Sequence, residues 1–284
     1  MKTAVPTTPG EIKSVLSRHG ISIRKSWGQN FLITAPVLER IIDAGQLSRE
    51  DTVLEVGPGL GCLTKRLAEQ AGRVIALEID PRLCRYLREQ FQMCSNVEIV
   101  EKDALKANLN ELVDGNYKVM ANLPYYITSP FLAGLLEKGP QPDLAVVLVQ
   151  WEVAQRLAAS PGSKDYGALS VLIQYHTQPE IVCKVSPGNF YPPPKVSSAV
   201  VKMTLLPRPA AKVRDVGFMF EVVKIAFGQR RKMLKGLLAK QYSIPPDQVE
   251  AIMLEAGLPG NVRGERLSVQ EFASLSDKLR EAIR

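Results

Sequence analysis

The sequence contains little histidine and little cysteine. Its 284 residues include 2 histidines and 4 cysteines, and no two cysteines stand in C-x-x-C spacing. Metal sites gather three or four such side chains at short spacings, so we predict no metal site. The cysteines fit ordinary reduced thiols, because nothing in the sequence indicates a secreted, disulfide-bonded domain.

Long apolar runs are also missing. No stretch approaches the ~18 consecutive apolar residues of a membrane-spanning helix. The first ten residues are polar and lack the apolar centre of a signal peptide. We therefore expect a cytoplasmic protein without a membrane partner. Its length allows one large domain or two smaller ones.

Positive charge is concentrated at the two ends of the chain. The formal net charge is +7, and residues 1–30 carry 5 Lys and Arg against 1 acidic residue. From Arg208 to the end there are 14 Lys and Arg and 9 acidic residues. A single surface charge is usually only solvated, but clustering of this kind favours contact with the phosphates of a nucleic acid.

The stretch Thr52 to Thr64 predicts a strand, a tight turn and a helix, with Gly57, Gly59 and Gly61 at alternate positions. Glycines in such a turn let the backbone approach a ligand closely. The spacing does not match G-x-G-x-x-G, because Cys62 takes the place of the third glycine, and the Gly-Lys-Ser/Thr of a phosphate loop is absent. A turn that binds no ligand remains an alternative.

Three later residues follow predicted strand ends. Glu78 follows Arg73 to Leu77, at the distance where such folds hold ribose hydroxyls, and Asp103 and Asn122 follow the next two strands. Strands that alternate with helices predict a parallel sheet, whose carboxyl edge is where open α/β sheets bind ligands. With Glu55, the glycine pattern resembles the cofactor site of class I S-adenosylmethionine methyltransferases.

The segment Asn122-Leu123-Pro124-Tyr125 indicates chemistry at an exocyclic amine. The amine of adenine is a poor nucleophile because its lone pair is delocalised into the ring. Two acceptors, the Asn122 side-chain oxygen and the Leu123 carbonyl, would favour a pyramidal nitrogen, and Tyr125 could stack on the base. No strong general base is needed, which agrees with the scarcity of histidine. A proline-containing turn without function is the alternative.

Five motifs together resemble the ribosomal RNA small-subunit adenine dimethyltransferase family (KsgA type). They are Ser26 to Leu32, Glu55 to Gly59, Asn122 to Tyr125, Asn189 to Ser198, and Ala226 to Lys232. The resemblance implies a class I methyltransferase (Rossmann-like) fold, with a mixed seven-stranded sheet, helices on both faces and a small all-helical C-terminal domain. Three parts are expected: a basic N-terminal arm (1–30), a catalytic domain that binds S-adenosylmethionine (31–207) and a helical RNA-binding domain (208–284).

The resemblance also implies the reaction and the residues that perform it. The reaction is dimethylation of two adjacent adenosines in the 3′-terminal hairpin of 16S rRNA, by a monomer that acts on the small ribosomal subunit. The catalytic set is Asn122, Leu123, Tyr125 and Phe190, with Tyr125 and Phe190 on either side of the base. The cofactor set is Gln29, Asn30, Leu32, Gly57, Gly59, Glu78, Asp103, Ala104 and Asn122. The RNA-binding set is Lys25, Arg230, Arg231, Lys232 and Lys235, of which Arg230 to Lys232 are expected on a helix.

Other functions remain open at this point. The chain could be a ribosome-assembly factor with little turnover, a relative that methylates 23S rRNA, or a small-molecule methyltransferase. Asn122 and Tyr125 favour an enzyme, because a protein that only binds RNA has no use for two acceptors at an amine. The sequence departs from the family motifs at two positions: Trp27 replaces the usual Phe, and Tyr126 stands where Asn is frequent. These departures concern the choice of substrate more than the chemistry.

Overall fold

A computed structural model describes residues 5–24 and 28–283. Lys25 and Trp27, named above, lie outside the described residues. The contacts between Cα atoms divide the chain into two compact units. Unit 1 comprises residues 1–154 and 179–205, and unit 2 comprises residues 155–178 and 206–284. The segment 155–178 therefore groups with the C-terminal helices, whereas the division made from the sequence placed it in the catalytic domain.

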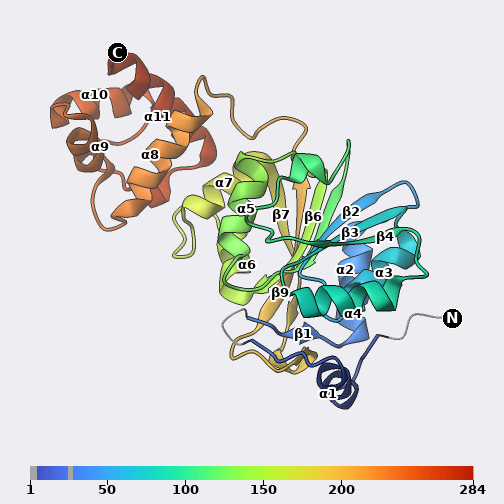
Figure 1. The fold of residues 1–284 in the computed structure, drawn as a ribbon. Helices are drawn as coiled ribbons and strands as arrows, with labels where there is room; N and C mark the ends of the chain where they lie inside the picture. Colours follow the sequence, from blue (N-terminus) through green and yellow to red (C-terminus); the bar gives the residue numbers. More distant parts are fainter. Residues whose placement is uncertain (1–4, 25–27, 284) are drawn as a thin grey trace. The chain divides into compact units, whose positions relative to one another are not determined.

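Unit 1 is built on a mixed seven-stranded sheet with the order β4-β3-β2-β5-β6-β9-β7 (Figure 1). Strands β2 to β6 are paired in parallel, and β9 runs antiparallel to β6. The strands are β2 (Thr52–Val56), β3 (Arg73–Glu78), β4 (Val97–Glu101), β5 (Lys118–Asn122), β6 (Leu144–Gln150), β7 (Thr177–Val185) and β9 (Ser198–Leu205). The central strand β6 is buried along Leu144 to Val149, as its continuous apolar run predicts.

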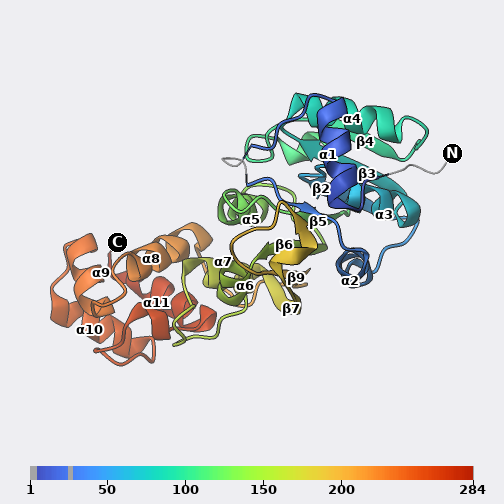
Figure 2. The same ribbon diagram turned by 90° about the horizontal axis from the view of Figure 1, so that it is seen from below.

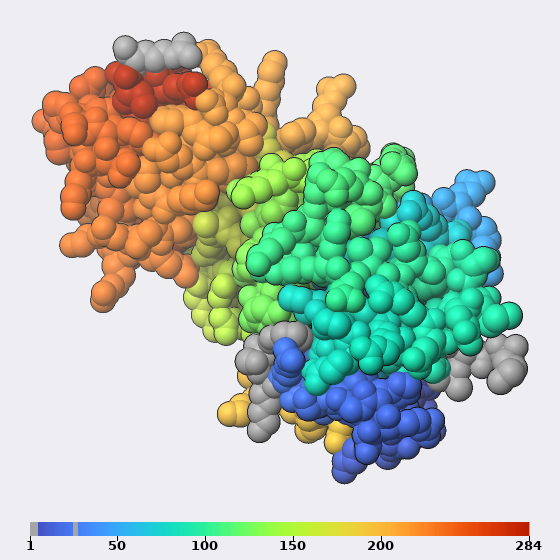
Figure 3. Space-filling model, in the orientation of Figure 1, coloured from blue at the N-terminus to red at the C-terminus, as the bar shows by residue number. Residues whose placement is uncertain are grey.

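Helices cover both faces of this sheet (Figure 2). On one face, apolar side chains of α2 and α3 pack with the strands in a single core cluster. Helix α4 packs with α1 in a second cluster on the same face, because Val97, the neighbour of Val74 in the sheet, packs against both clusters. Helix α5 covers the other face, because the connection from β5 to β6 runs along the sheet in the opposite direction (Figure 2). Figure 3 shows the N-terminal helix, in dark blue, lying against the teal surface of α4. The helices are α1 (Pro9–Arg18), α2 (Ala35–Gly45), α3 (Cys62–Gln70), α4 (Pro81–Phe91), α5 (Thr128–Glu137) and α6 (Trp151–Leu157).

The N-terminal part of the chain is anchored to unit 1 rather than extended. Thr8 and Glu11 form a capping box at the start of α1, and Ile12 and Leu16 of that helix are buried. A separate two-stranded sheet follows, in which β1 (Phe31–Leu32) pairs with β8 (Phe190–Tyr191) and Leu32 lies opposite Phe190. Two of the predicted site residues are thus neighbours although they are far apart in the sequence.

Unit 2 is helical. Its helices are α7 (Ala168–His176), α8 (Val216–Gly228), α9 (Leu234–Tyr242), α10 (Pro246–Glu255) and α11 (Val269–Ala282). Met219, Val222 and Ala226 form part of the buried face of α8. One prediction about this unit was wrong: Arg230 to Lys232 do not lie on a helix, because α8 ends at Gly228 and these residues form the turn before α9.

The predicted fold class is confirmed. The structure has the mixed seven-stranded sheet with helices on both faces, and a helical part at the C-terminal end. In residues 5–24 and 28–283, no helix has the length and apolar character needed to cross a membrane.

Candidate functional site

The site lies where the order of the strands reverses. The chain proceeds outward from β2 through β3 to β4, and then continues on the other side of β2 with β5 and β6. Open α/β sheets bind ligands at the carboxyl edge of such a switch point, because the connections leave it in opposite directions. Gly57 follows β2, and Asn122 ends β5. The topology therefore brings the glycine turn beside the Asn122 motif.

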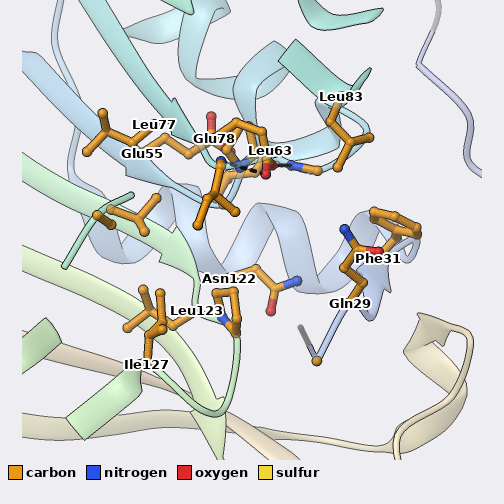
Figure 4. A pocket seen from close by; sticks show the side chains of 18 of the residues that line it. Gln29, Phe31, Glu55, Leu63, Leu77, Glu78, Leu83, Asn122, Leu123 and Ile127 are labelled. Atoms are coloured by element: carbon orange, nitrogen blue, oxygen red, sulfur yellow. Dashed lines mark hydrogen bonds between the residues drawn. The ribbon is translucent and has the colours of Figure 1, made fainter. Parts of the chain in front are cut away.

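A pocket at this edge collects the whole predicted cofactor set. Figure 4 shows Glu78, Asn122 and Gln29 around one cavity. The predicted residues that line it are Gln29, Asn30, Leu32, Gly57, Gly59, Glu78, Asp103, Ala104, Asn122, Leu123 and Tyr125. In the described part of the chain, no group of three or more His, Cys, Asp or Glu side chains could hold a metal ion.

The turn after β2 requires its three glycines. Gly57, Gly59 and Gly61 have φ values of 70°, 58° and 83°, in the left-handed region that side chains with a Cβ rarely adopt. A Cβ atom on Gly59 would lie 2.9 Å from Cδ1 of Phe31, and one on Gly61 would lie 2.7 Å from Cε2 of Phe91. The loop can therefore sit between Phe31 and the α4 side chains only while these positions have no side chain.

Glu78 fastens the end of β3 to the glycine turn. Its Oε1 accepts hydrogen bonds from the backbone N–H groups of Ile79 (2.9 Å) and Asp80 (3.0 Å), and its Oε2 accepts one from Gly59 (3.3 Å). The side chain is buried, and burial raises the pKa of the Glu78 carboxyl to about 7, although the three donors act in the opposite direction. Its place on the pocket wall leaves it available to ligand hydroxyls.

Glu55 is a second buried carboxyl beside the pocket. It is 1% exposed, and burial is the main cause that raises its pKa to about 8, with a smaller contribution from the negative charge of Glu78. In the described residues, Glu55 Oε2 has no hydrogen-bond partner. A buried acceptor without a partner is costly, so this atom marks a position where a ligand's donor would be stabilised.

Asn122 is oriented by a backbone group from the N-terminal segment. Its Nδ2 donates to the carbonyl oxygen of Asn30 at 3.0 Å. Since this bond uses the donor end of the amide, Oδ1 is the end left to accept a hydrogen bond in the pocket. Asn30 contributes through its main chain here, while its own side chain donates to the carbonyl of Gly28.

Tyr125 stands on a turn just after β5. Ile127 donates its backbone N–H to the Pro124 carbonyl at 3.1 Å, which closes the turn. The Tyr125 hydroxyl lies 2.8 Å from Ser198 Oγ, and burial raises the pKa of the phenol. The ring is half-buried and lines the pocket, so one part of it remains accessible to a ligand.

Phe190 lies apart from this group. It is 3% exposed, belongs to the core cluster that contains Leu32, and is not among the residues that line the pocket. Its role beside the target base remains a prediction. Its side chain packs between core residues.

Asp103 and Gln29 are held by local hydrogen bonds. Asp103 Oδ1 accepts from the backbone N–H of Leu105 at 3.0 Å, so this carboxylate stabilises the turn after β4. Gln29 Oε1 accepts from the backbone N–H of Arg24 at 2.8 Å. Both side chains line the pocket, and their proposed contacts with the cofactor are additional to these bonds.

Sequence reasoning missed several apolar residues of the pocket. Ile79 is 38% exposed, which is unusual for isoleucine, and it lines the pocket directly after Glu78. Phe31 and Ile127 line it as well. The sequence contained one sign of this role for Ile79, which is its position directly after the acidic residue at the end of a strand. An apolar side chain at that place suits the face of an aromatic ligand.

The predicted RNA-binding residues differ in their surroundings. Arg230 Nη2 donates to the carbonyls of Lys164 (3.0 Å) and Tyr166 (2.8 Å), and its Nε lies 3.4 Å from Glu265 Oε2. Lys235 Nζ lies 2.6 Å from Glu250 Oε2. These two cations therefore have structural partners.

Arg231 and Lys232 are exposed on the turn between α8 and α9. They are better placed to meet phosphate groups than Arg230 and Lys235. Lys25, the fifth predicted residue, lies outside the described residues.

The sequence matches known proteins over nearly its full length. A family model described as ribosomal RNA adenine dimethylase matches residues 20–281. A protein of Pelotomaculum thermopropionicum named ribosomal RNA small subunit methyltransferase A is 46% identical over 290 residues, which cover 98% of each chain. The protein of the same name from Bacillus mycoides is 43% identical and covers 96% of each chain.

Solved structures give a consistent result. A dimethyladenosine transferase from Plasmodium falciparum superposes with a TM-score of 0.73 at 25% identity, over 86% of this chain and 95% of its own. The 23S rRNA methyltransferase ErmE superposes with a TM-score of 0.70 at 29% identity, over 88% of this chain and 100% of its own.

Proposed function

The chain belongs to the ribosomal RNA adenine dimethylase family, and from this premise we propose that it dimethylates two adjacent adenosines in the 3′-terminal hairpin of 16S rRNA. The methyl donor is S-adenosylmethionine, the substrate is the small ribosomal subunit, and the modification belongs to the biogenesis of that subunit. The protein acts as a monomer in the cytoplasm.

The orientation of Asn122 is the observation that carries this proposal. With Nδ2 bonded to the Asn30 carbonyl, Oδ1 is directed to accept a hydrogen bond from the target amine. The Leu123 carbonyl serves as the second acceptor. Two acceptors at the two amine hydrogens favour the pyramidal nitrogen, so the lone pair becomes available for attack without a general base.

The pocket fits S-adenosylmethionine by the character of its donors and acceptors. The unpartnered Glu55 Oε2 suits the cationic amino group of the methionine part, because a positive charge beside it would lower the raised pKa of Glu55 and stabilise its charged form. Glu78 suits the ribose hydroxyls, Asp103 suits the adenine amine, and Ile79 offers an apolar face to the adenine ring. S-adenosylmethionine, when bound, supplies an electrophilic methyl group on a sulfonium centre.

Tyr125 and Phe190 are proposed to hold the extruded base by stacking. Base–aromatic stacking contributes about 1 to 3 kcal/mol per base, and it helps to compensate the cost of removing a base from its stack. Tyr125 lines the pocket and is half-buried, which suits this role. Phe190 takes part only if its side chain leaves the core cluster.

The small-subunit substrate is favoured over the large-subunit one by the degree of similarity. Two proteins named ribosomal RNA small subunit methyltransferase A are 46% and 43% identical to this chain over nearly its whole length. Exposed cations such as Arg231 and Lys232 suit contact with rRNA phosphates. A small-molecule methyltransferase would have no use for them.

Mass spectrometry of small-subunit RNA tests the proposal. Unmethylated subunits incubated with the protein and S-adenosylmethionine should gain four methyl groups, two on each of two adjacent adenosines. Methyl groups only on 23S rRNA would assign the chain to the large subunit. Tight binding without any transfer would indicate an assembly factor instead.

A further inference from the structure

A buried serine on the opposite side of β6 holds the far end of the Tyr125 ring. Ser198 Oγ lies 2.8 Å from the Tyr125 hydroxyl, and Ser198 is 0% exposed. We infer that Ser198 is a positioning residue that sets the orientation of the Tyr125 ring toward the target base. The inference rests on the proposed function, because Tyr125 must first be the residue on which the base stacks.

The antiparallel strand makes this contact possible. Strands β5 and β6 run in parallel and both end at the pocket edge, where Asn122 lies opposite Leu148. Strand β9 runs the other way, so its first residue, Ser198, pairs with the last residue of β6, Gln150. The N-terminal end of β9 therefore reaches the same edge as the catalytic turn.

The backbone of Tyr125 is fixed separately from its ring. The Pro124 carbonyl accepts the Ile127 N–H at 3.1 Å and the Thr128 hydroxyl at 3.3 Å, which holds the turn. These bonds do not determine the angle of the ring, because an aromatic ring turns about its side-chain torsions. The Ser198 bond acts on the hydroxyl, the atom farthest from the backbone, where it restrains those torsions most effectively.

The geometry has a kinetic consequence. A stacking surface that is held in one orientation keeps the target amine near the position for attack, and loss of this restraint affects the transition state more than initial binding. A hydrogen bond of this kind corresponds to roughly a 3- to 10-fold change in rate. We expect kcat to fall by that factor, while KM for the subunit changes less than twofold.

The test is a double-mutant cycle with Ser198→Ala and Tyr125→Phe. Each substitution removes one partner of the bond and leaves the other side chain in place. We expect each to lower kcat by about 3- to 10-fold, and the double variant to be no slower than either single variant. Affinity for S-adenosylmethionine, measured by calorimetry, should stay the same in all three. Ser197→Ala is the matched control and should have the activity of the wild type, because the neighbouring Ser197 interacts through its carbonyl with the N–H of Trp151.

Four outcomes separate the possibilities. Additive losses in the cycle, or normal kcat in both single variants, would overturn the positioning role of Ser198. A fall in kcat of Ser198→Ala together with an equal loss of cofactor affinity would also overturn it, because the variant would then have disturbed the whole site. If the wild-type protein itself transfers no methyl group, the proposed function fails, and this failure is independent of the bond between Ser198 and Tyr125.

Discussion

At the residue scale, the site depends on side chains that form hydrogen bonds within the protein and still present a polar atom to the pocket. Asn122 is the clearest case, because Nδ2 donates to the Asn30 carbonyl and Oδ1 remains as an acceptor. Glu78 uses both oxygens to hold the turn at Gly59 and the start of the following helix, yet it still lines the pocket. These residues therefore both build the site and are proposed to act in it.

Replacement of Asn122 by alanine should reduce the methylation rate by at least about 100-fold, since one preorganised polar contact to a reacting group has an effect of this size. Cofactor affinity should change much less. Single-turnover transfer of labelled methyl groups and calorimetry measure the two quantities. Asn110→Ala, at an exposed position outside the pocket, is the control. A normal rate in Asn122→Ala would refute the acceptor role.

The two buried carboxyls predict a pH dependence of stability without ligand. The pKa values of Glu55 and Glu78 rise from the ordinary 4.5 to about 8 and about 7. A carboxyl with a higher pKa in the folded state binds more protons there than in the unfolded state, so the free energy of unfolding falls as the pH rises from about 4.5 to about 8. The effect of Glu55 is on the order of a few kcal/mol.

Glu55→Gln should therefore flatten this profile. The variant should gain stability relative to wild type at pH 8 and show little difference at pH 5, because a neutral amide removes the cost of the buried charge. Thermal unfolding at the two pH values measures this. Glu50→Gln, at an exposed position, should leave the profile as in wild type. An unchanged slope in Glu55→Gln would mean that Glu55 is not the group that titrates.

At the element scale, the unit that matters most is β2, the glycine turn and α3. The path of the chain through this turn depends on its three glycines, because all three have positive φ. Gly59→Ala should destabilise the protein by about 1 to 2 kcal/mol, as a left-handed residue with a Cβ does, and should weaken cofactor binding. The added methyl group would press on Phe31.

Gly134→Ala is a matched control for that variant. Gly134 lies inside α5, and a Cβ there would meet nothing within 4 Å. We expect this change to stabilise the protein by about 0.5 to 1 kcal/mol through helix propensity. Denaturant unfolding and calorimetry check both variants. Equal effects of the two substitutions would show that backbone strain and the Phe31 contact do not matter.

At the scale of the whole molecule, the net charge of +7 favours a polyanionic partner, but position decides which charges contribute. Neutralising Arg231 and Lys232 together should weaken binding to small subunits and reduce the slope of log affinity against log salt by about 2. Thermal stability should not change. Binding titrations between low and moderate salt measure the slope.

Two control variants complete this experiment. Lys106→Gln with Lys138→Gln removes the same charge from exposed positions in unit 1 and should alter the slope less. Arg230→Ala should lower thermal stability, because it leaves the Lys164 and Tyr166 carbonyls without their donor. If both double variants bind equally, total charge and not the α8–α9 turn determines the affinity.

The sequence alone determined the fold class and the predicted cofactor set that lines the pocket, but not the apolar residues of its wall. The glycine spacing, Glu78, Asp103 and the Asn122 motif depend on local conformation and on the periodicity of buried strands, and both can be read from neighbouring residues. The wrong prediction concerned Arg230 to Lys232. Arginine and lysine are good helix formers, so the pattern suggested a continuous helix. Gly228, where α8 ends, was the local sign of a break.

Only the tertiary structure decided how the site is assembled. Asn30 orients Asn122 across 92 residues, Ser198 reaches Tyr125 across 73, and Arg230 caps carbonyls more than 60 residues away. Such contacts depend on how distant segments pack, and the Ser198 contact depends on the reversed direction of β9, which no local pattern encodes. The pairing of β8 with β1 is also a long-range contact, and it places Phe190 opposite Leu32 in the same core cluster. The residues proposed to perform the chemistry therefore lie in short sequence motifs, while the groups that orient them are brought there by the packing of distant segments.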